Sequence, residues 1–222
     1  MIAKAKGITL GYHKYLDTSV IARVYTREFG LISLIVGGIR SQKSKRTPIY
    51  FESLNILNVV FYLNSKSDLY RCNEYKSDLM VRSIRTEPLK NAIAVFLAEF
   101  LWKIMQVEKQ NQVEIFEFLA SIIKILETAN KDYYDLHLKT LLKLTHYLGF
   151  GLVRDSVQID HNINDKTLDK IESLALHPLI RKSELNGQLR SKILNVLIDY
   201  YTYHLGINID IKSLKVLTEI IK

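Results

Sequence analysis

Residues 19–36 read SVIARVYTREFGLISLIV, and this stretch sets the architecture of the first third of the chain. In its first half, Val20, Ala22 and Val24 fall on one face of an extended segment, and the residues between them fall on the other. That alternation has the period of a half-buried β-strand. Residues 31–36 are apolar, partly β-branched and bounded by glycines. The stretch therefore predicts two strands, at 19–27 and 31–36.

Three more extended segments accompany this pair, at residues 3–12, 56–62 and 69–74. Each is bounded by glycines or by polar turn residues. Five strands within the first 80 residues is the count of an OB-type Greek-key barrel. At this level, an SH3-like barrel or a small sandwich remains an alternative.

From Thr86 onward the apolar residues recur with a helical period. Thr86 is suited to cap a first helix of about five turns, because Pro88 then occupies the first turn. Further helices are expected at about 112–127, 133–148, 165–174, 187–205 and 212–221, with Gly149 and Gly206 as C-caps. The sequence thus predicts an α+β protein, with an N-terminal OB-fold barrel (residues 1–82) followed by an all-α helical domain (residues 83–222).

The composition excludes several classes of protein. With 48% hydrophobic and 24% charged residues among 222, the chain can bury a sizeable core. Cys72 is the single cysteine, which excludes an intramolecular disulfide, a cysteine-rich zinc site and an iron–sulfur cluster within one chain. No apolar run approaches the roughly 18 residues of a membrane span, and the first residues lack the apolar region of a signal peptide. We expect a soluble, cytoplasmic protein without membrane contact.

Positive charge gathers in the predicted barrel. The net charge is +8, and residues 1–80 hold 12 basic but only 6 acidic side chains. Arg40, Lys43, Lys45 and Arg46 lie within seven residues, directly after a strand that ends in glycines. A flexible basic loop can follow the phosphates of a polyanion. The alternative is a solvated loop without a ligand.

Aromatic residues are interleaved with these cations, ten of them within residues 1–80. Stacking platforms beside cations are typical of proteins that bind single strands. Most of the rings should belong to the core, whereas Tyr12, Tyr25 and Tyr15 are expected outside. The candidate nucleic-acid-binding residues are therefore Lys14, Arg23, Tyr25, Arg27, Arg40, Lys43, Lys45 and Arg46.

Motifs for catalysis or metal binding are missing from the sequence. The six histidines show no metal-ligand spacing, and the paired glycines at 37 and 38 are not followed by the Lys of a P-loop. Asp160, Asn162 and Asn164 imitate the start of a calcium loop, but Asp165 stands where the turn glycine is required. We therefore expect no catalytic residue, no metal and no cofactor.

Four motifs near the N-terminus resemble the OB domain of the bacterial RecO recombination mediators in order and spacing. They are GITL (7–10), YLDTS (15–19), YTREFG (25–30) and GIRSQKSK (38–45), and weaker matches such as AVFLAEFL (94–101) and LGF (148–150) extend into the helical part. The resemblance implies a protein that binds single- and double-stranded DNA, anneals complementary strands and, with RecR, helps RecA replace single-strand-binding protein (SSB). Many members carry a cysteine quartet for zinc after the position of LGF, but residues 151–186 contain no cysteine.

The resemblance also implies that the acidic tail of SSB is a ligand, with RecF as a further candidate partner and the nucleoid as the place of work. A chain-terminal carboxylate needs a cation at the rim of an apolar cleft. Lys139 and Lys143 lie four residues apart on an otherwise apolar helix and could form that rim, or they could be two solvated lysines. For the whole protein, the alternatives are an OB-containing nuclease or nucleic-acid-processing enzyme, and an adaptor that binds only proteins.

Overall fold

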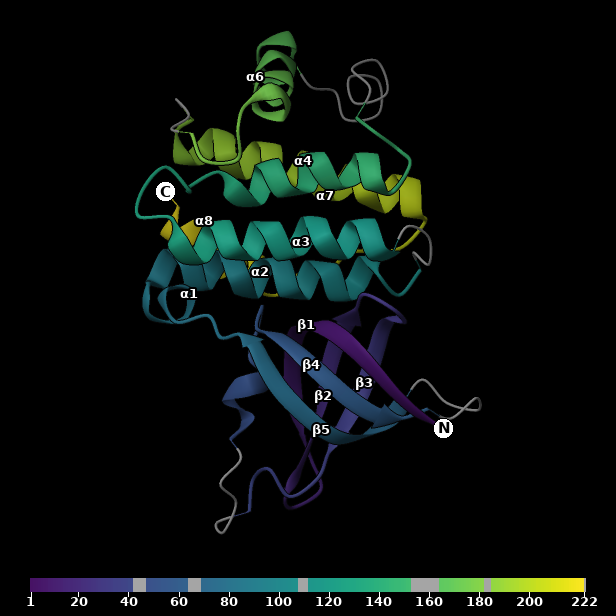
Figure 1. Ribbon diagram of the computed structural model, residues 1–222. Helices are drawn as coiled ribbons and strands as arrows, with labels where there is room; N and C mark the ends of the chain where they lie inside the picture. The colour runs from purple at the N-terminus through teal and green to yellow at the C-terminus, as the bar shows by residue number, and fades with distance from the viewer. Residues whose placement is uncertain (42–46, 64–68, 108–111, 153–163, 182–184, 222) are drawn as a thin grey trace. The chain divides into compact units, whose positions relative to one another are not determined.

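A computed structural model describes residues 1–41, 47–63, 69–107, 112–152, 164–181 and 185–221 (Figure 1). Its five strands form a closed barrel in the order β1-β2-β3-β5-β4. All neighbouring strands are antiparallel except β3 and β5, which are parallel. This arrangement confirms the OB-type barrel over the SH3-like and sandwich alternatives. The strands are β1 (Ile2–Tyr15), β2 (Ser19–Thr26), β3 (Gly30–Val36), β4 (Ile56–Tyr62) and β5 (Leu69–Leu79).

Strand β1 closes the barrel because it pairs along its length with two different strands. Its first half pairs with β4, from Ile2 opposite Tyr62, and its second half continues along β2 to Tyr15 opposite Ser19. Between Thr9 and Tyr12 the register with β2 shifts, and Gly11 has a φ of +103° there. Only glycine adopts such a φ without strain, so this bulge lets a 14-residue strand bend around the barrel.

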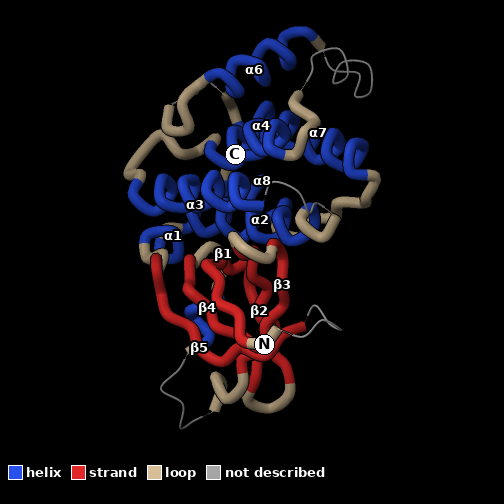
Figure 2. The backbone as a smooth tube through the Cα atoms, turned by 45° about the vertical axis from the view of Figure 1, so that its right-hand side comes forward, coloured by secondary structure: helices blue, strands red, loops and turns tan. Residues whose placement is uncertain are grey.

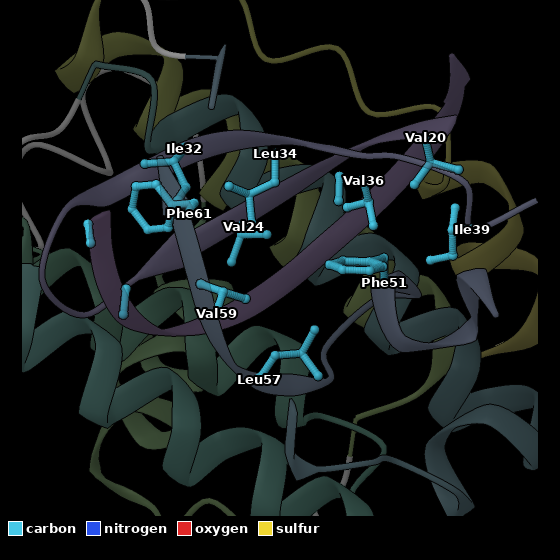
Figure 3. Close-up of a cluster of buried hydrophobic side chains, with 13 residues drawn as sticks. Val20, Val24, Ile32, Leu34, Val36, Ile39, Phe51, Leu57, Val59 and Phe61 are labelled. Atoms are coloured by element: carbon cyan, nitrogen blue, oxygen red, sulfur yellow. The ribbon is translucent and has the colours of Figure 1, made fainter. Parts of the chain in front are cut away.

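The barrel interior contains the side chains that the alternation in residues 19–36 assigned to it. Val20, Ala22 and Val24 are fully buried, and they belong to a cluster of 13 residues that all five strands surround (Figure 3). The short 3-10 helix η1 (Pro48–Phe51) contributes Phe51, which lies with Ile39 toward one end of this cluster. Burial of these apolar side chains is the main favourable free energy of the barrel.

The chain forms two compact units. The first comprises Met1–Arg82 with Ala98–Ser121, and the second comprises Ser83–Leu97 with Ile122–Lys222. The division runs through two helices, α2 (Pro88–Ile104) and α3 (Gln112–Thr128). The first unit is therefore the barrel together with the C-terminal part of α2 and the N-terminal part of α3. The assignment of residues 1–82 and 83–222 to separate functional domains stays a prediction.

In the second unit, α4 contacts both α6 and α7, and α6 contacts α7 (Figure 2). Asn164 and Asn186 cap α6 and α7 through side-chain oxygens that accept the N–H groups of Thr167 and Leu189. Gly206 ends α7 with a φ of +63°, as its predicted role as a C-cap requires.

The remaining helices are α1 (Ser83–Thr86), α4 (Leu136–Tyr147), α6 (Asp165–Leu176), α7 (Gly187–Leu205) and α8 (Leu214–Ile220). Within the described ranges, no helix has the length and apolar character needed to cross a membrane.

The prediction of Thr86 as an N-cap is wrong, because Thr86 is the last residue of the short helix α1. The carboxylate of Glu127 accepts hydrogen bonds from the N–H groups of Ser83 and Ile84, at 2.9 and 3.0 Å. It satisfies the first donors of α1 from 43 or 44 residues away in the sequence. The buried ammonium of Lys90 adds a 2.5 Å hydrogen bond to the hydroxyl of Ser83.

Candidate nucleic-acid interface

Lys14 and Arg40 both lie beside the turn between β1 and β2, at one end of the barrel. Lys14 lies opposite Val20 in the β1–β2 ladder and is exposed. The backbone N–H of Arg40 donates to the carbonyl of Thr18 at 2.9 Å, and its guanidinium donates to the carbonyl of Leu16 at 3.2 Å. A guanidinium has five N–H donors, so the group is fixed at the turn and keeps donors that suit a phosphate.

The other three cations of the basic segment, Lys43, Lys45 and Arg46, lie outside the described residues. The described residues on either side belong to this same end of the barrel. Ser41 donates its N–H to the carbonyl of Gly38 at 3.2 Å, and the hydroxyl of Thr47 accepts the N–H of Ile49 at the start of η1. The role of these three cations stays a prediction.

Arg23 and Arg27 lie on the outer face of β2, but helical residues of the same unit contact both. The guanidinium of Arg23 lies 4.2 Å from the ring centre of Trp102 in α2. Burial lowers the pKa of Arg23, against the opposing effect of the nearby Glu99. The Nε of Arg27 lies 2.7 Å from a carboxylate oxygen of Glu117 in α3, in a pair whose side chains are 41% and 59% exposed. Both cations are thus engaged by the protein itself.

The prediction that Tyr25 lies outside the barrel in solvent is wrong. Its side chain is 1% exposed, and its hydroxyl donates to the backbone oxygen of Gln112 at 3.5 Å. The alternation in β2 does place this ring on the outer face, but there the side chain is buried and its hydroxyl contacts the backbone of Gln112, the first residue of α3. A covered ring cannot stack on a base. By contrast, Tyr12 is 38% exposed, as predicted, whereas Tyr15 is half-buried.

The eight predicted DNA-binding residues therefore divide into three groups. Lys14 and Arg40 lie at one end of the barrel, Arg23, Tyr25 and Arg27 contact residues of α2 or α3, and the remaining three lie outside the described residues. The sequence reasoning did not select Tyr62 and Arg71, which are exposed neighbours on β4 and β5. Tyr62 lies four residues after the polar Asn58 in β4, so both side chains point to the same face of the strand. This alternation is the signal that could have placed Tyr62 on the outside.

Lys139 and Lys143 were predicted to form the cationic rim of a cleft. The position of Lys139 does not support this prediction. This side chain is 1% exposed. Its ammonium donates to the carbonyls of Pro178, Leu179 and Arg181 at 2.9, 3.2 and 3.1 Å. Burial lowers the pKa of Lys139.

Lys143 is half-buried, and its ammonium makes a longer contact, 3.4 Å, with the carbonyl of Ala175. Backbone carbonyls of the segment after α6 thus occupy the donors of Lys139 that a carboxylate would need. That segment lies about 40 residues from α4 in the sequence, so the helical pattern of α4 gave no sign of it.

The described residues were also compared with the geometry of metal sites and reactive thiols. There, no group of three or more His, Cys, Asp or Glu side chains is placed to hold a metal ion. Cys72 is half-buried in β5 and contacts the carbonyl of Glu74 at 3.5 Å.

Comparison with known proteins covers nearly the whole chain. The family models "Recombination protein O N terminal" and "Recombination protein O C terminal" match residues 1–78 and 85–157. The DNA repair protein RecO of Phocaeicola vulgatus is 30% identical over 240 residues, covering 99% of each chain. The DNA repair protein RecO of Flavobacterium psychrophilum is also 30% identical over 240 residues, with the same coverage. The barrel, the helical region and these matches identify the chain as a member of the RecO family of DNA repair proteins.

Proposed function

We propose that this protein binds single- and double-stranded DNA through the cationic end of its barrel and anneals complementary strands without catalysing a covalent reaction. The observation that carries the proposal is the placement of Lys14 and Arg40 beside one turn, with the other three cations of the basic segment following Arg40 within six residues in the sequence. This proposal leaves out Tyr25, whose side chain is buried, and also Arg23 and Arg27, which contact Trp102 and Glu117.

The physical basis of annealing is electrostatic. Each phosphate that a Lys or Arg neutralises releases counterions, which favours binding irrespective of base sequence. Two strands held by one cationic surface repel each other less, and base pairing then supplies the driving force. No side chain needs to exchange a proton or form a covalent bond in this process.

The wider role follows from the family resemblance. With RecR, the protein would help RecA replace SSB on single-stranded DNA at the nucleoid, and RecF is a further candidate partner. Binding of the acidic SSB tail would fall to the helical region. Because Lys139 is committed to three carbonyls, the Lys139–Lys143 pair is not the cation site of this proposal.

The test is a charge reversal at the barrel end, Lys14→Glu together with Arg40→Glu. We expect affinity for both single strand and duplex at low salt, and the rate of annealing, to fall about tenfold or more, since two charge-assisted contacts are lost. Fluorescence anisotropy and a fluorescence-quenching annealing assay measure the two effects. Lys166→Glu with Lys192→Glu is the matched control, because it changes the net charge equally at two exposed helical positions.

Equal losses in the two double variants would contradict a localised interface. Shortening of labelled DNA in the presence of Mg²⁺, abolished by substitution of one carboxylate, would favour the nuclease alternative. Failure of the wild-type protein to shift any oligonucleotide at low salt would favour an adaptor that binds only proteins.

A further inference from the structure

One row of directly paired residues runs around the whole outside of the barrel. It starts at Ile2 in β1 and crosses β4, β5, β3 and β2 before it meets β1 again, 11 residues further along that strand, at His13. We call this row the barrel belt. Its members, in order around the barrel, are Ile2, Tyr62, Arg71, Ile35, Ile21 and His13.

The belt side chains point outward. Residues directly opposite each other in a ladder share a face of the sheet, and the strand neighbours of the belt, such as Val20, Val36 and Phe61, are buried inside the barrel. Ile2 is 56% exposed and Tyr62 is 46% exposed. Arg71 and His13 are exposed, whereas the two central isoleucines are half-buried. The belt is thus a strip on the outer face of the barrel whose two ends are exposed and whose centre is half-buried.

The composition of the strip suits a nucleic acid. Tyr62 lies between an exposed isoleucine and an arginine, so a ring, an apolar neighbour and a cation follow one another on three adjacent strands. Bases stack on aromatic rings irrespective of sequence, and a neighbouring guanidinium can bind the phosphate that follows. An acidic peptide with a terminal carboxylate would need an apolar cleft beside the cation, whereas the belt is a row on the outer surface of a closed barrel. The chemistry therefore favours a single-stranded nucleic acid.

The belt also leads to the cationic end of the barrel. Neighbouring strands lie about 4.8 Å apart, so the path of five steps around the barrel from Ile2 to His13 is about 24 Å long. His13 directly precedes Lys14, which belongs to the interface with Arg40. A length of this size fits the short single-strand sites of OB folds, which begin at about four nucleotides. A single DNA strand bound along the belt would therefore also contact Lys14.

We propose that the barrel belt is the track of a single DNA strand, on which Tyr62 stacks a base and Arg71 binds a phosphate. This inference rests on the proposed DNA-binding function and adds to it a distinction between two ligands. In a duplex the bases are stacked inside the double helix and cannot lie on Tyr62. Single-stranded DNA therefore uses the belt and the cationic end, whereas duplex DNA uses the cationic end alone.

The experiment compares Tyr62→Ala and Arg71→Ala with the wild-type protein on a labelled dT oligonucleotide and on a labelled duplex. We expect each substitution to weaken single-strand binding about tenfold and to leave duplex binding unchanged. Tyr62→Phe keeps the ring and should keep wild-type affinity. Tyr203→Ala removes a tyrosine that is 65% exposed elsewhere, and Lys76→Ala removes an exposed cation from the same strand as Arg71. Both controls should behave as wild type.

If Tyr62→Ala binds single-stranded DNA as tightly as the wild-type protein does, the proposed role of the belt is wrong. An equal loss on both ligands also overturns it, because stacking affects only unpaired bases. Thermal unfolding shows whether each variant is folded, and Tyr62→Leu replaces the alanine variant if that one is destabilised, since leucine keeps an apolar side chain without a ring. If the wild-type protein binds neither DNA, the proposed function itself fails, which is a different result from a belt variant that matches wild type.

Discussion

His137 is the residue whose environment has the clearest consequence for pH dependence. It lies in α4, fully buried, with the edge of its ring toward Phe96 at a centroid distance of 6.2 Å. Burial lowers its pKa to about 4, and the positive charge of Arg190 adds to this effect while Asp135 opposes it. The ring is therefore neutral in the folded protein at neutral pH.

This pKa predicts a loss of stability in weak acid. The unfolded chain takes up a proton on His137 near its ordinary pKa of about 6.5, whereas the folded chain does so only near 4. Its contribution to stability is complete above pH 6.5 and is lost as the pH falls toward 4. We expect His137 to account for about 2 kcal/mol of the fall in unfolding free energy between pH 7.5 and pH 5.

Urea unfolding of the wild-type protein and of His137→Leu at both pH values measures the effect. Leucine removes the titrating group, while the carboxylates that also titrate are common to both proteins. Parallel pH profiles would show that the histidine ring gains access to water or to a charge partner in the folded state.

At the scale of elements, β2 packs on both of its faces. Its even-numbered residues Val20, Ala22 and Val24 fill the barrel, and its outer face meets α2 and α3 through Arg23 and Tyr25. Trp102, which Arg23 contacts, is the single tryptophan of the chain. Its fluorescence therefore reports on the contact between the strand and α2.

We predict that Arg23→Ala changes the emission of Trp102 and destabilises the protein by about 1 kcal/mol, because a cation–π contact is lost. Addition of duplex DNA to the wild-type protein should leave the emission unchanged, since the cationic end of the barrel lies at the other end of β2. Steady-state fluorescence and chemical unfolding test both points. Quenching of Trp102 by DNA would return Arg23 to the list of DNA contacts.

The elements also show which features a single sequence can predict. Most strands and helices were predicted to within a few residues, because their alternation, caps and glycines are local signals, although β5 extends five residues beyond its predicted end. Three features were not, and each depends on a group more than 35 residues away. Glu127 caps α1, Gln112 covers Tyr25, and the carbonyl of Pro178 binds Lys139. A periodic pattern assigns a side chain to a face but cannot say which other segment covers that face.

For the whole molecule, the net charge of +8 and its bias toward the first 80 residues determine the response to salt. If binding neutralises about four to six phosphates of a single strand, log affinity should fall with log salt at a slope of roughly −3 to −4. We predict that the triple substitution of Lys43, Lys45 and Arg46 by alanine flattens this slope by about 2. Thermal stability should stay the same if these three residues form the solvated loop that the sequence predicts, because charges on such a loop contribute little to folding.

Anisotropy titrations between about 50 and 200 mM salt measure the slope, and the exposed helical cations Lys166, Lys170 and Lys192 provide a triple alanine control of equal charge. A slope that is the same in wild type and in the loop variant would remove the basic segment from the DNA site.

The cover over Tyr25 has a consequence for protein synthesis. The last strand of the barrel ends at Leu79, but the backbone oxygen that the Tyr25 hydroxyl contacts belongs to Gln112. At roughly 5 to 20 residues per second, a ribosome needs about 2 to 7 s to add the residues between them. During this interval the nascent chain carries all five strands and gains α2 but does not yet carry α3, whose first residue contacts the Tyr25 hydroxyl. A ribosome that stalls before Gln112 would therefore present this tyrosine to chaperones and to neighbouring chains.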